Sequence, residues 1–219
     1  MSRLVIFGAA DSARLAHFYF RTDSAHQVEA FVVDAAYKTG DTFDGLPLCA
    51  FEELAARYPP SEFDAFVAVG YARMNRVRRA KYEAIKAAGY RCASYVSSRC
   101  TYLSTTPPGD NAFILEDNTV QPFVTIGNNV TLWSGNHIGH DSTIEDHCFI
   151  TSHVVVSGHV RVGAGSFLGV NATLRNAITI GPETLVAGGS VIMKSTVAKG
   201  VYYPERARRL PKSSDEIDL

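Results

Sequence analysis

Histidine is concentrated in one short part of this sequence. Five of the seven histidines fall between residues 137 and 159, namely His137, His140, His147, His153 and His159. A neutral imidazole can accept a proton near physiological pH, and it is also a common ligand of transition metals. The cluster therefore suggests either a metal centre or a general base, and the spacing of the residues helps to choose between them.

The spacing of three of these histidines disfavours a metal centre. His147, His153 and His159 are six residues apart. If the chain coils with a six-residue repeat, they occupy equivalent corners on three different edges of the coil and diverge. A protein zinc site instead needs three or four ligands that converge on one point. We therefore predict no metal site.

His140 is a candidate for a general base. It belongs to the turn-like sequence Ile138-Gly139-His140-Asp141. The neighbouring carboxylate favours the protonated ring and so raises its basicity, and a positioned imidazole can take a proton from an attacking nucleophile. The alternative is that His140 is a surface turn residue and that Asp141 only caps its own turn.

An uninterrupted six-residue repeat positions these histidines. Self-similarity with this period is typical of a parallel β-helix. The aliphatic residues would point to the axis of a three-sided coil, each stacked on the residue eighteen positions away. They are Ile114, Val120, Ile126, Leu132, Ile138, Ile144, Ile150, Val156, Val162, Leu168, Leu174, Ile180, Val186 and Ile192. Glycines follow several of them, at 127, 139, 163, 169 and 181, where we expect a turn to use their conformational freedom.

The first 95 residues alternate between predicted strands and helices. We expect strands at 4–7, 30–33, 65–69 and 90–96, a turn at 45–47, and helices ending at 20, 58 and 88. This alternation favours a small parallel sheet covered by helices. A turn-rich connector at 104–110 separates it from the coil. The predicted domains are therefore 1–103 and 111–200, followed by a tail at 201–219.

The carboxyl ends of the predicted strands carry candidate ligand-binding residues. Open parallel sheets bind ligands beyond these ends, and N–H groups at the start of the first helix could hold a phosphate. The absence of a GxGxxG motif disfavours NAD. An ordinary strand-to-helix turn and a solvated strand end are the alternatives. The candidates are Gly8, Ala10, Asp11, Ser12, Asp34 and Gly70.

The composition is that of a globular protein. The chain is 46% hydrophobic and 20% charged, and its net charge of −1 predicts no nucleic-acid partner. The apolar run at residues 4–10 is too short for a signal peptide or a membrane span. The four cysteines lack CxxC spacing and are expected to be reduced thiols of a cytoplasmic protein.

Several features of the sequence resemble the NeuD-like sugar acyltransferases. They are the hexads, the Gly139-His140-Asp141 turn, the segment 167–172, the Gly188-Gly189 turn and the N-terminal sheet. The sequence is most similar to bacterial N-acetyltransferases of nucleotide-linked 4-amino-4,6-dideoxy sugars, of the bacillosamine and perosamine type. The resemblance implies a left-handed parallel β-helix, a homotrimer with acetyl-CoA bound between neighbouring coils, and a role in surface polysaccharide synthesis such as that of the lipopolysaccharide O-antigen.

The resemblance also implies roles for individual residues. His140 corresponds to the family's base and Asp141 to its supporting acid. The substrate loop and the nucleotide contacts correspond to Ala10, Asp11, Ser12, Asp34 and Ala35. The family's backbone contacts to acetyl-CoA correspond to Gly158, Val170 and Gly188. Phe149 stands near acetyl-CoA, where some members have a histidine, and Arg206 could pair with the phosphates of acetyl-CoA. The sequence departs from the family in the bulkier loop 8–11 and in the ending 204–208.

Together these features predict an N-acetyltransferase. His140 would take the proton of the sugar amine, and a backbone N–H near Gly158 would stabilise the oxyanion. A sugar O-acetyltransferase of the sialic-acid type would use the same base on a hydroxyl. A metal-dependent hydratase on the same coil and a non-enzymatic scaffold are further alternatives, which metal analysis and acetyl-CoA binding would distinguish.

Overall fold

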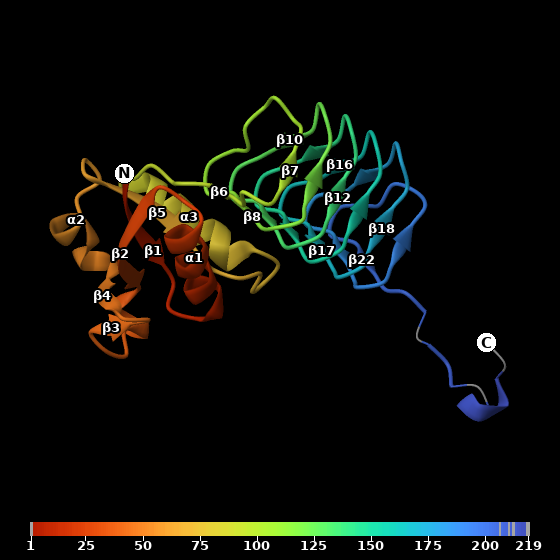
Figure 1. The fold of residues 1–219 in the computed structure, drawn as a ribbon, viewed down its shortest axis with the longest axis horizontal. Coiled ribbons are helices and arrows are strands. Elements are labelled where there is room, and N and C mark those ends of the chain that lie inside the picture. The colour runs from red at the N-terminus through yellow and green to blue at the C-terminus, as the bar shows by residue number, and fades with distance from the viewer. Residues whose placement is uncertain (1, 206, 210, 212, 218–219) are drawn as a thin grey trace.

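The chain forms an N-terminal α/β domain, a coil of short parallel strands and an extended C-terminal tail (Figure 1). The computed structural model describes residues 2–205, 207–209, 211 and 213–217. The predicted fold class, a small α/β sheet followed by a left-handed parallel β-helix, is confirmed. No helix among the described residues has both the length and the apolar character needed to cross a membrane.

The N-terminal domain is built on a five-stranded sheet with the order β3-β4-β2-β1-β5. Its elements are β1 (Ser2–Phe7), α1 (Asp11–Thr22), β2 (His26–Val33), a 3₁₀ turn (Ala35–Tyr37), β3 (Thr42–Phe43), β4 (Leu46–Ala50), a second 3₁₀ turn (Phe51–Glu53), α2 (Leu54–Arg57), β5 (Phe63–Val67) and α3 (Arg76–Ala87). The pairs among β1, β2, β4 and β5 are parallel, whereas β3 pairs antiparallel with β4.

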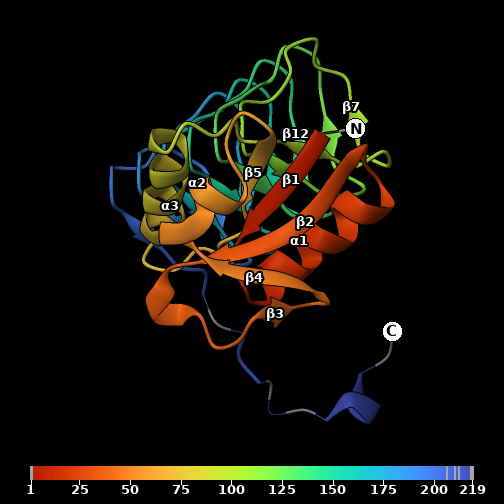
Figure 2. The ribbon, with the colours of Figure 1, turned by 90° about the vertical axis from the view of Figure 1, so that its left-hand side faces the viewer.

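Alternate side chains of β1 pack on opposite faces of this sheet. Leu4 and Ile6 pack in one buried cluster with α1 and the first coil strands. Val5 and Phe7 point to the opposite face and pack in another cluster with α2 and α3. The helices lie on both sides of the sheet (Figure 2), so its central strands are buried on both faces, as their continuous apolar sequences require.

Two local predictions for this domain were wrong. The turn predicted at 45–47 lies one residue earlier, because Asp44 and Gly45 have positive φ angles (46° and 81°) and Leu46 already begins β4. The strand predicted at 90–96 is a single bridge between Ala65 and Cys92, followed by β6 (Tyr95–Val96). Because β6 pairs with β8 (Phe113–Ile114), it belongs to the coil rather than to the sheet.

The coil consists of three parallel sheets of two-residue strands. The orders are β22-β20-β17-β14-β11-β8-β6, β21-β18-β15-β12-β9-β7 and β10-β13-β16-β19. The remaining strands are β7 (Thr101–Tyr102), β9 (Thr119–Val120), β10 (Thr125–Ile126), β11 (Thr131–Leu132), β12 (His137–Ile138), β13 (Thr143–Ile144), β14 (Phe149–Ile150), β15 (Val155–Val156), β16 (Arg161–Val162), β17 (Phe167–Leu168), β18 (Thr173–Leu174), β19 (Thr179–Ile180), β20 (Leu185–Val186), β21 (Val191–Ile192) and β22 (Val201–Tyr202). A further 3₁₀ turn, Ser214–Glu216, lies in the tail.

The backbone ladder of the coil fixes the register of every side chain. The N–H of Phe113 donates to the carbonyl of Val130, and the N–H of Thr125 donates to the carbonyl of Ser142, seventeen residues later in each case. From β6 to β21, paired strand residues are therefore eighteen positions apart, whereas those of the last pair, β20 and β22, are sixteen apart. The predicted axial stack is confirmed, because all the aliphatic positions of the repeat from Ile114 to Ile192 are buried.

The stack begins before the predicted connector. β6 pairs with β8 and β7 pairs with β9, and Val96 and Tyr102 pack on the coil core. The sequence pattern did not reveal this first turn because Tyr102 is aromatic and Pro108 interrupts the aliphatic repeat. The domain limits at 103 and 111 remain a prediction, but the strand pairing crosses them.

Every sixth residue between 111 and 189 has a left-handed backbone. These corner residues are Asn111, Asp117, Phe123, Asn129, Gly135, Asp141, His147, His153, His159, Gly165, Asn171, Ala177, Glu183 and Gly189. Asn, Asp and His adopt this conformation more readily than most other residues with a side chain. The six-residue spacing of three histidines is therefore a property of the corners, and these histidines diverge as predicted.

The glycines that follow the aliphatic positions have a different role from the predicted one. Their φ angles are not positive. A Cβ atom at Gly139 would lie 2.5 Å from the carbonyl carbon of Ser157, and one at Gly163 would lie 2.6 Å from the nitrogen of Pro182. Glycine is required there because the backbone of the next turn of the coil comes too close for a side chain.

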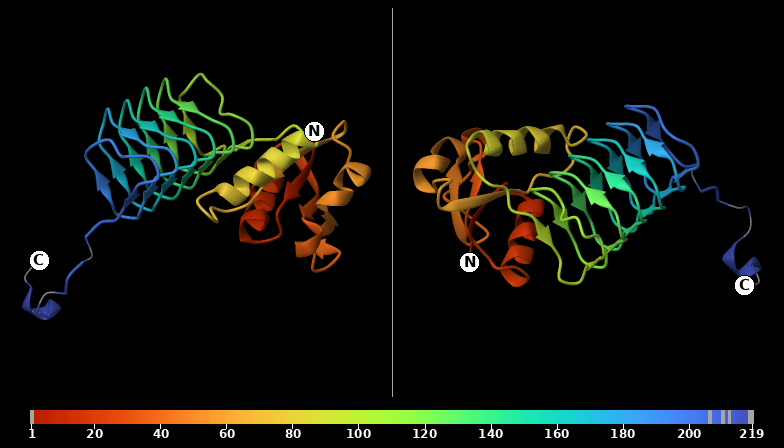
Figure 3. Two further views of the ribbon diagram at one scale, coloured as in Figure 1. Left: turned by 180° about the vertical axis from the view of Figure 1, so that it is seen from behind. Right: turned by 90° about the horizontal axis from the view of Figure 1, so that it is seen from above.

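Helix α3 lies beside the coil (Figure 3), and a buried arginine of this helix joins the two. Arg78 is only 1% exposed, and burial lowers the pKa of its guanidinium to about 10. Its Nη2 donates to the carbonyls of His147 (2.9 Å) and Cys148 (3.2 Å), and its Nη1 donates to Asn129 and Thr131. The planar group also lies over the ring of Phe149, 5.4 Å from its centroid. These contacts attach one domain to the other.

Replacing this arginine tests that joint. Arg78→Met would leave the carbonyls of Asn129 and His147 buried without their donor, so we expect the free energy of unfolding to fall by about 3 kcal/mol. Urea unfolding followed by circular dichroism and by the fluorescence of Trp133, the single tryptophan, measures this loss. Arg79→Met is the matched control, since Arg79 makes an exposed pair with Glu83 worth about 0.5 kcal/mol or less. Equal stability of the two variants would contradict the assignment.

Candidate functional site

One corner of the coil brings together three of the predicted site residues. His140 and Asp141 follow β12, and Gly158 follows β15 in the next turn. His140 Nδ1 lies 2.8 Å from Asp141 Oδ2. The N–H of His140 donates to Gln121 Oε1 (2.9 Å), and its carbonyl accepts from the N–H of His159 (2.9 Å). The imidazole is thus held on a rigid backbone while half of its side chain stays exposed.

These contacts define which nitrogen of His140 can act as a base. An ionised carboxylate can only accept hydrogen bonds, so Asp141 selects the tautomer with its proton on Nδ1. The lone pair of the neutral ring is then on Nε2. A Cβ atom on Gly158 would lie 2.7 Å from this Nε2. Glycine at 158 therefore leaves the space that the basic nitrogen faces.

His159 belongs to the same corner, which the sequence analysis missed. Its Nε2 lies 3.9 Å from Asp141 Oδ2, and its ring meets that of His140 edge to face with the centroids 5.0 Å apart. Histidines six residues apart in the sequence occupy different corners, so their spacing gave no sign of this contact. The signal that could have found this contact is the eighteen-residue separation of Asp141 and His159.

The predicted thioester and pantetheine contacts occupy two corners. Val170 and Gly188 lie between β17 and β18 and between β20 and β21, whereas His140 and Gly158 lie at the corner that follows β12 and β15. The N–H of Gly189 donates to the carbonyl of Val170 (2.8 Å), and Val170 is 47% exposed. Within one chain, Val170 therefore lies next to Gly188, and His140 lies next to Gly158. The two pairs, however, lie at different corners of the coil.

The other two predicted acetyl-CoA residues are placed differently. Phe149 is buried on the outer face of the seven-stranded sheet, where it stacks on Phe167 (6.0 Å between centroids) and contacts the edge of Tyr71 (5.1 Å). It faces the N-terminal domain rather than the corner of His140. Arg206 lies outside the described residues.

Gly8 and Gly70 lie at a topological switch point of the N-terminal sheet. β1 is flanked by β2 on one side and by β5 on the other, and open sheets bind ligands where the strand order reverses in this way. Gly8 has a φ of 133°, and a Cβ there would lie 2.7 Å from the carbonyl oxygen of Ala68. Only glycine fits this turn between β1 and α1.

The start of α1 carries three more of the predicted residues. Ala10 is the N-cap and makes no side-chain cap, so N–H groups of the first turn are open to an anionic ligand. Asp11 is exposed and pairs with Arg14 (3.2 Å), which offsets its charge at this end of the helix. The hydroxyl of Ser12 lies 3.7 Å from the position that a Cβ on Gly70 would occupy.

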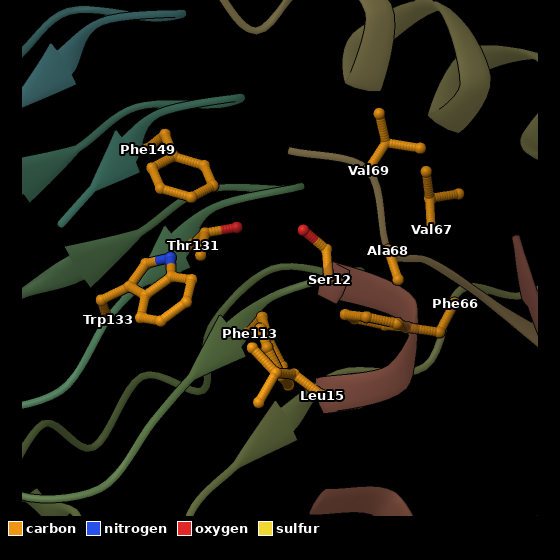
Figure 4. Close-up of a pocket in the computed structure, with 10 residues that line it drawn as sticks. All are labelled: Ser12, Leu15, Phe66, Val67, Ala68, Val69, Phe113, Thr131, Trp133 and Phe149. Atoms are coloured by element: carbon orange, nitrogen blue, oxygen red, sulfur yellow. The ribbon is translucent and has the colours of Figure 1, made fainter. Parts of the chain in front are cut away.

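An apolar pocket lies between this helix and the coil (Figure 4). The hydroxyls of Ser12 and Thr131 point toward each other across it. Its walls come from α1, from β5 and the residues after it, and from the outer face of the seven-stranded sheet. The lining residues are Ser12, Leu15, Phe66, Val67, Ala68, Val69, Phe113, Thr131, Trp133 and Phe149. The pocket connects the switch point to the coil.

Asp34 and Ala35 lie at the carboxyl end of β2, on the other side of β1 from Gly70. Asp34 Oδ1 forms an ion pair with Lys81 Nζ (2.6 Å), and the N–H of Ala35 donates to Glu52 Oε2 (3.1 Å). The Asp34 carboxylate is therefore partly occupied by a cation, although its remaining acceptor positions can still serve a ligand hydroxyl.

The sequence has recognisable relatives. Residues 124–158 match the family of bacterial transferase hexapeptide (six repeats). Over 74 residues the chain is 32% identical to an acyl-[acyl-carrier-protein]–UDP-N-acetylglucosamine O-acyltransferase of Stutzerimonas stutzeri, which covers 34% of this chain and 29% of that protein. Over 88 residues it is 32% identical to the enzyme of that name from Pseudomonas aeruginosa, covering 39% and 34%. The match spans about a third of these curated relatives.

Solved structures share the fold over most of the chain. PerB from Caulobacter crescentus, in complex with CoA and GDP-perosamine, has a TM-score of 0.80 at 20% identity and covers 92% of this chain and 93% of that one. The acetyltransferase domain of PglB from Neisseria gonorrhoeae has a TM-score of 0.74 at 22% identity, covering 89% and 93%. WeeI from Acinetobacter baumannii has a TM-score of 0.77 at 18% identity, covering 92% and 96%. The predicted resemblance is confirmed, and at these identities it establishes the fold.

Proposed function

We propose that the protein is an acyltransferase that moves the acetyl group of acetyl-CoA to the 4-amino group of a nucleotide-linked amino-deoxy sugar. The observation that carries this proposal is the His140–Asp141 pair, whose free Nε2 faces the space left by Gly158. Support comes from structures of the same fold with CoA and GDP-perosamine bound. No metal takes part in the proposed reaction.

The residues at this corner suit each step of acetyl transfer. The sugar amine attacks the thioester carbonyl, and His140 Nε2 accepts the amine proton. Asp141 stabilises the imidazolium that forms, and the backbone N–H of Gly158 is positioned near the developing oxyanion. Collapse of the tetrahedral intermediate breaks the carbon–sulfur bond, and the imidazolium returns its proton to the CoA thiolate. The products are the acetamido sugar and CoA.

The N-terminal sheet supplies the acceptor site in this proposal. The uncapped start of α1 offers N–H groups to a diphosphate, and the switch-point residues Gly8 and Gly70 leave room for it. Asp34 and Ala35 stand where a nucleoside would extend along the carboxyl edge of the sheet. Ser12 lies at the mouth of the apolar pocket, between this edge and the coil.

A neighbouring copy of the chain completes the donor site. His140 and Gly158 occupy one corner, whereas Val170 and Gly188 occupy another. A homotrimer would set the first corner of one subunit against the second corner of the next, so that acetyl-CoA lies between two coils. Arg206 would then pair with its phosphates. We place this enzyme in the cytoplasm, in the synthesis of a surface polysaccharide such as the O-antigen.

A sugar O-acyltransferase is the second candidate. The two sequence relatives described above are acyl-[acyl-carrier-protein]–UDP-N-acetylglucosamine O-acyltransferases. The same imidazole could accept a proton from a hydroxyl instead of an amine. The acceptor group therefore has to be identified directly.

Replacing His140 tests the proposed base. A positioned base contributes about 10²–10⁴ in rate, so His140→Ala should lower kcat by this factor while acetyl-CoA affinity and the circular dichroism spectrum stay unchanged. His153→Ala is the control, because His153 is also an exposed histidine but lies at a different corner of the coil, between β14 and β15. Wild-type turnover in His140→Ala would remove this residue from the mechanism.

A substrate panel tests the acceptor. We expect release of the CoA thiol, measured with a thiol reagent, when UDP-, GDP- or dTDP-linked 4-amino-4,6-dideoxy sugars are supplied. The matching 4-hydroxy sugars should release none. Thiol release with the hydroxy sugars alone would favour the O-acyltransferase, and release with neither set would contradict both candidates.

A further inference from the structure

The corner that carries His140 also presents three metal-ligating side chains. One ligand atom from each of His140, Asp141 and His159 lies within 4.8 Å of the other two. Asp141 Oδ2 is central, 2.8 Å from His140 Nδ1 and 3.9 Å from His159 Nε2. The ligand atoms of His140 and Asp141, which follow β12, and of His159 in the next turn of the coil therefore converge. Histidines six residues apart in the sequence instead diverge.

The backbone holds these three donors in register. Asp141 and His159 are corner residues with φ angles of 57° and 58°, eighteen positions apart in the coil. The N–H of His159 donates to the carbonyl of His140 (2.9 Å). Both turns are part of the same parallel ladder, so only side-chain rotation is needed to bring the ligand atoms to one point.

The chemistry of the donors suits a borderline-soft cation. Two imidazoles and one carboxylate are a ligand set that zinc sites use, with the fourth position left to water or another ligand. Mg²⁺ and Ca²⁺ prefer oxygen ligands, and this corner supplies one carboxylate. All three side chains are partly exposed, so an ion can enter from solvent and keep a bound water.

We propose that His140, Asp141 and His159 bind one Zn²⁺ or a similar divalent transition-metal ion, and that the bound ion inhibits the enzyme. The ion would occupy the carboxylate and the imidazole of the proposed base pair, so that His140 could no longer exchange a proton. It is an inhibitor and not a cofactor. The site stands on the geometry alone, whereas its inhibitory effect rests on the proposed function.

Two other corner histidines provide a contrast. His153 is exposed, lies next to Gly135 on a different edge of the coil, and has a φ of 58° like His159. His147 is buried and contacts Asn129 Nδ2 through Nδ1 (3.0 Å). His153 therefore offers a matched control with the same residue type and the same backbone, but outside the cluster of three donors.

Calorimetry with ZnCl₂ tests the site without any assay of activity. We expect one Zn²⁺ per wild-type chain. Asparagine tolerates the left-handed corner, so His159→Asn should fold normally, and its Zn²⁺ affinity should fall by about 100-fold or more. His153→Asn should bind as the wild type does. Absence of binding to the wild type, or wild-type affinity in His159→Asn, would overturn the proposal.

Acetyl-transfer assays test the inhibitory effect. Each protein is compared with its own activity in buffer with a chelator. Added Zn²⁺ should inhibit the wild type and His153→Asn but not His159→Asn. Equal inhibition of all three would place the inhibitory ion elsewhere and overturn this part. Zn²⁺ binding to a chain that shows no transfer would support the site and contradict the proposed function, so the two failures are distinguishable.

Discussion

The hydrogen-bond ladder of the coil is the constraint on which the rest of the structure depends. In most coil strands the N–H of the first residue donates to a carbonyl seventeen residues later, so side chains lie over those eighteen positions further on. This register places Gly158 over His140, His159 over Asp141 and Gly188 over Val170. The candidate chemistry therefore follows from backbone pairing, because residues far apart in the sequence are held at one strand spacing.

The second constraint is the fixed attachment of the sheet domain. Arg78 is surrounded by carbonyls of the coil, and Asn75 Nδ2 donates to the carbonyls of Gly165 and Ser166 in the next turn of the coil. These buried polar contacts hold α3 against the coil, and with it the sheet whose switch point opens toward the apolar pocket. An acceptor bound at the sheet would thus meet the coil at a defined distance, which acetyl transfer requires.

The sequence predicted the coil well because its signal repeats. Every aliphatic position from Ile114 to Ile192 is buried, and His140 contacts Asp141 as expected. The missed features depend on contacts across the coil or between domains. His159 joins the site through an eighteen-residue separation, β6 belongs to the coil because it pairs with β8, and the glycines after aliphatic residues are required by neighbouring backbone. None of these follows from local propensity.

In the proposed mechanism, one catalytic centre uses corners from two chains. Mixing His140→Ala chains with Gly188→Leu chains tests it most directly, because each variant alone spoils every shared centre. In trimers that form by random mixing, an intact His140 corner of one chain meets an intact Gly188 corner of the next at one interface in four. We expect acetyl transfer, which should be at least about 100-fold slower in either variant alone, to return to roughly a quarter of the wild-type rate. No recovery after refolding the mixture would contradict it.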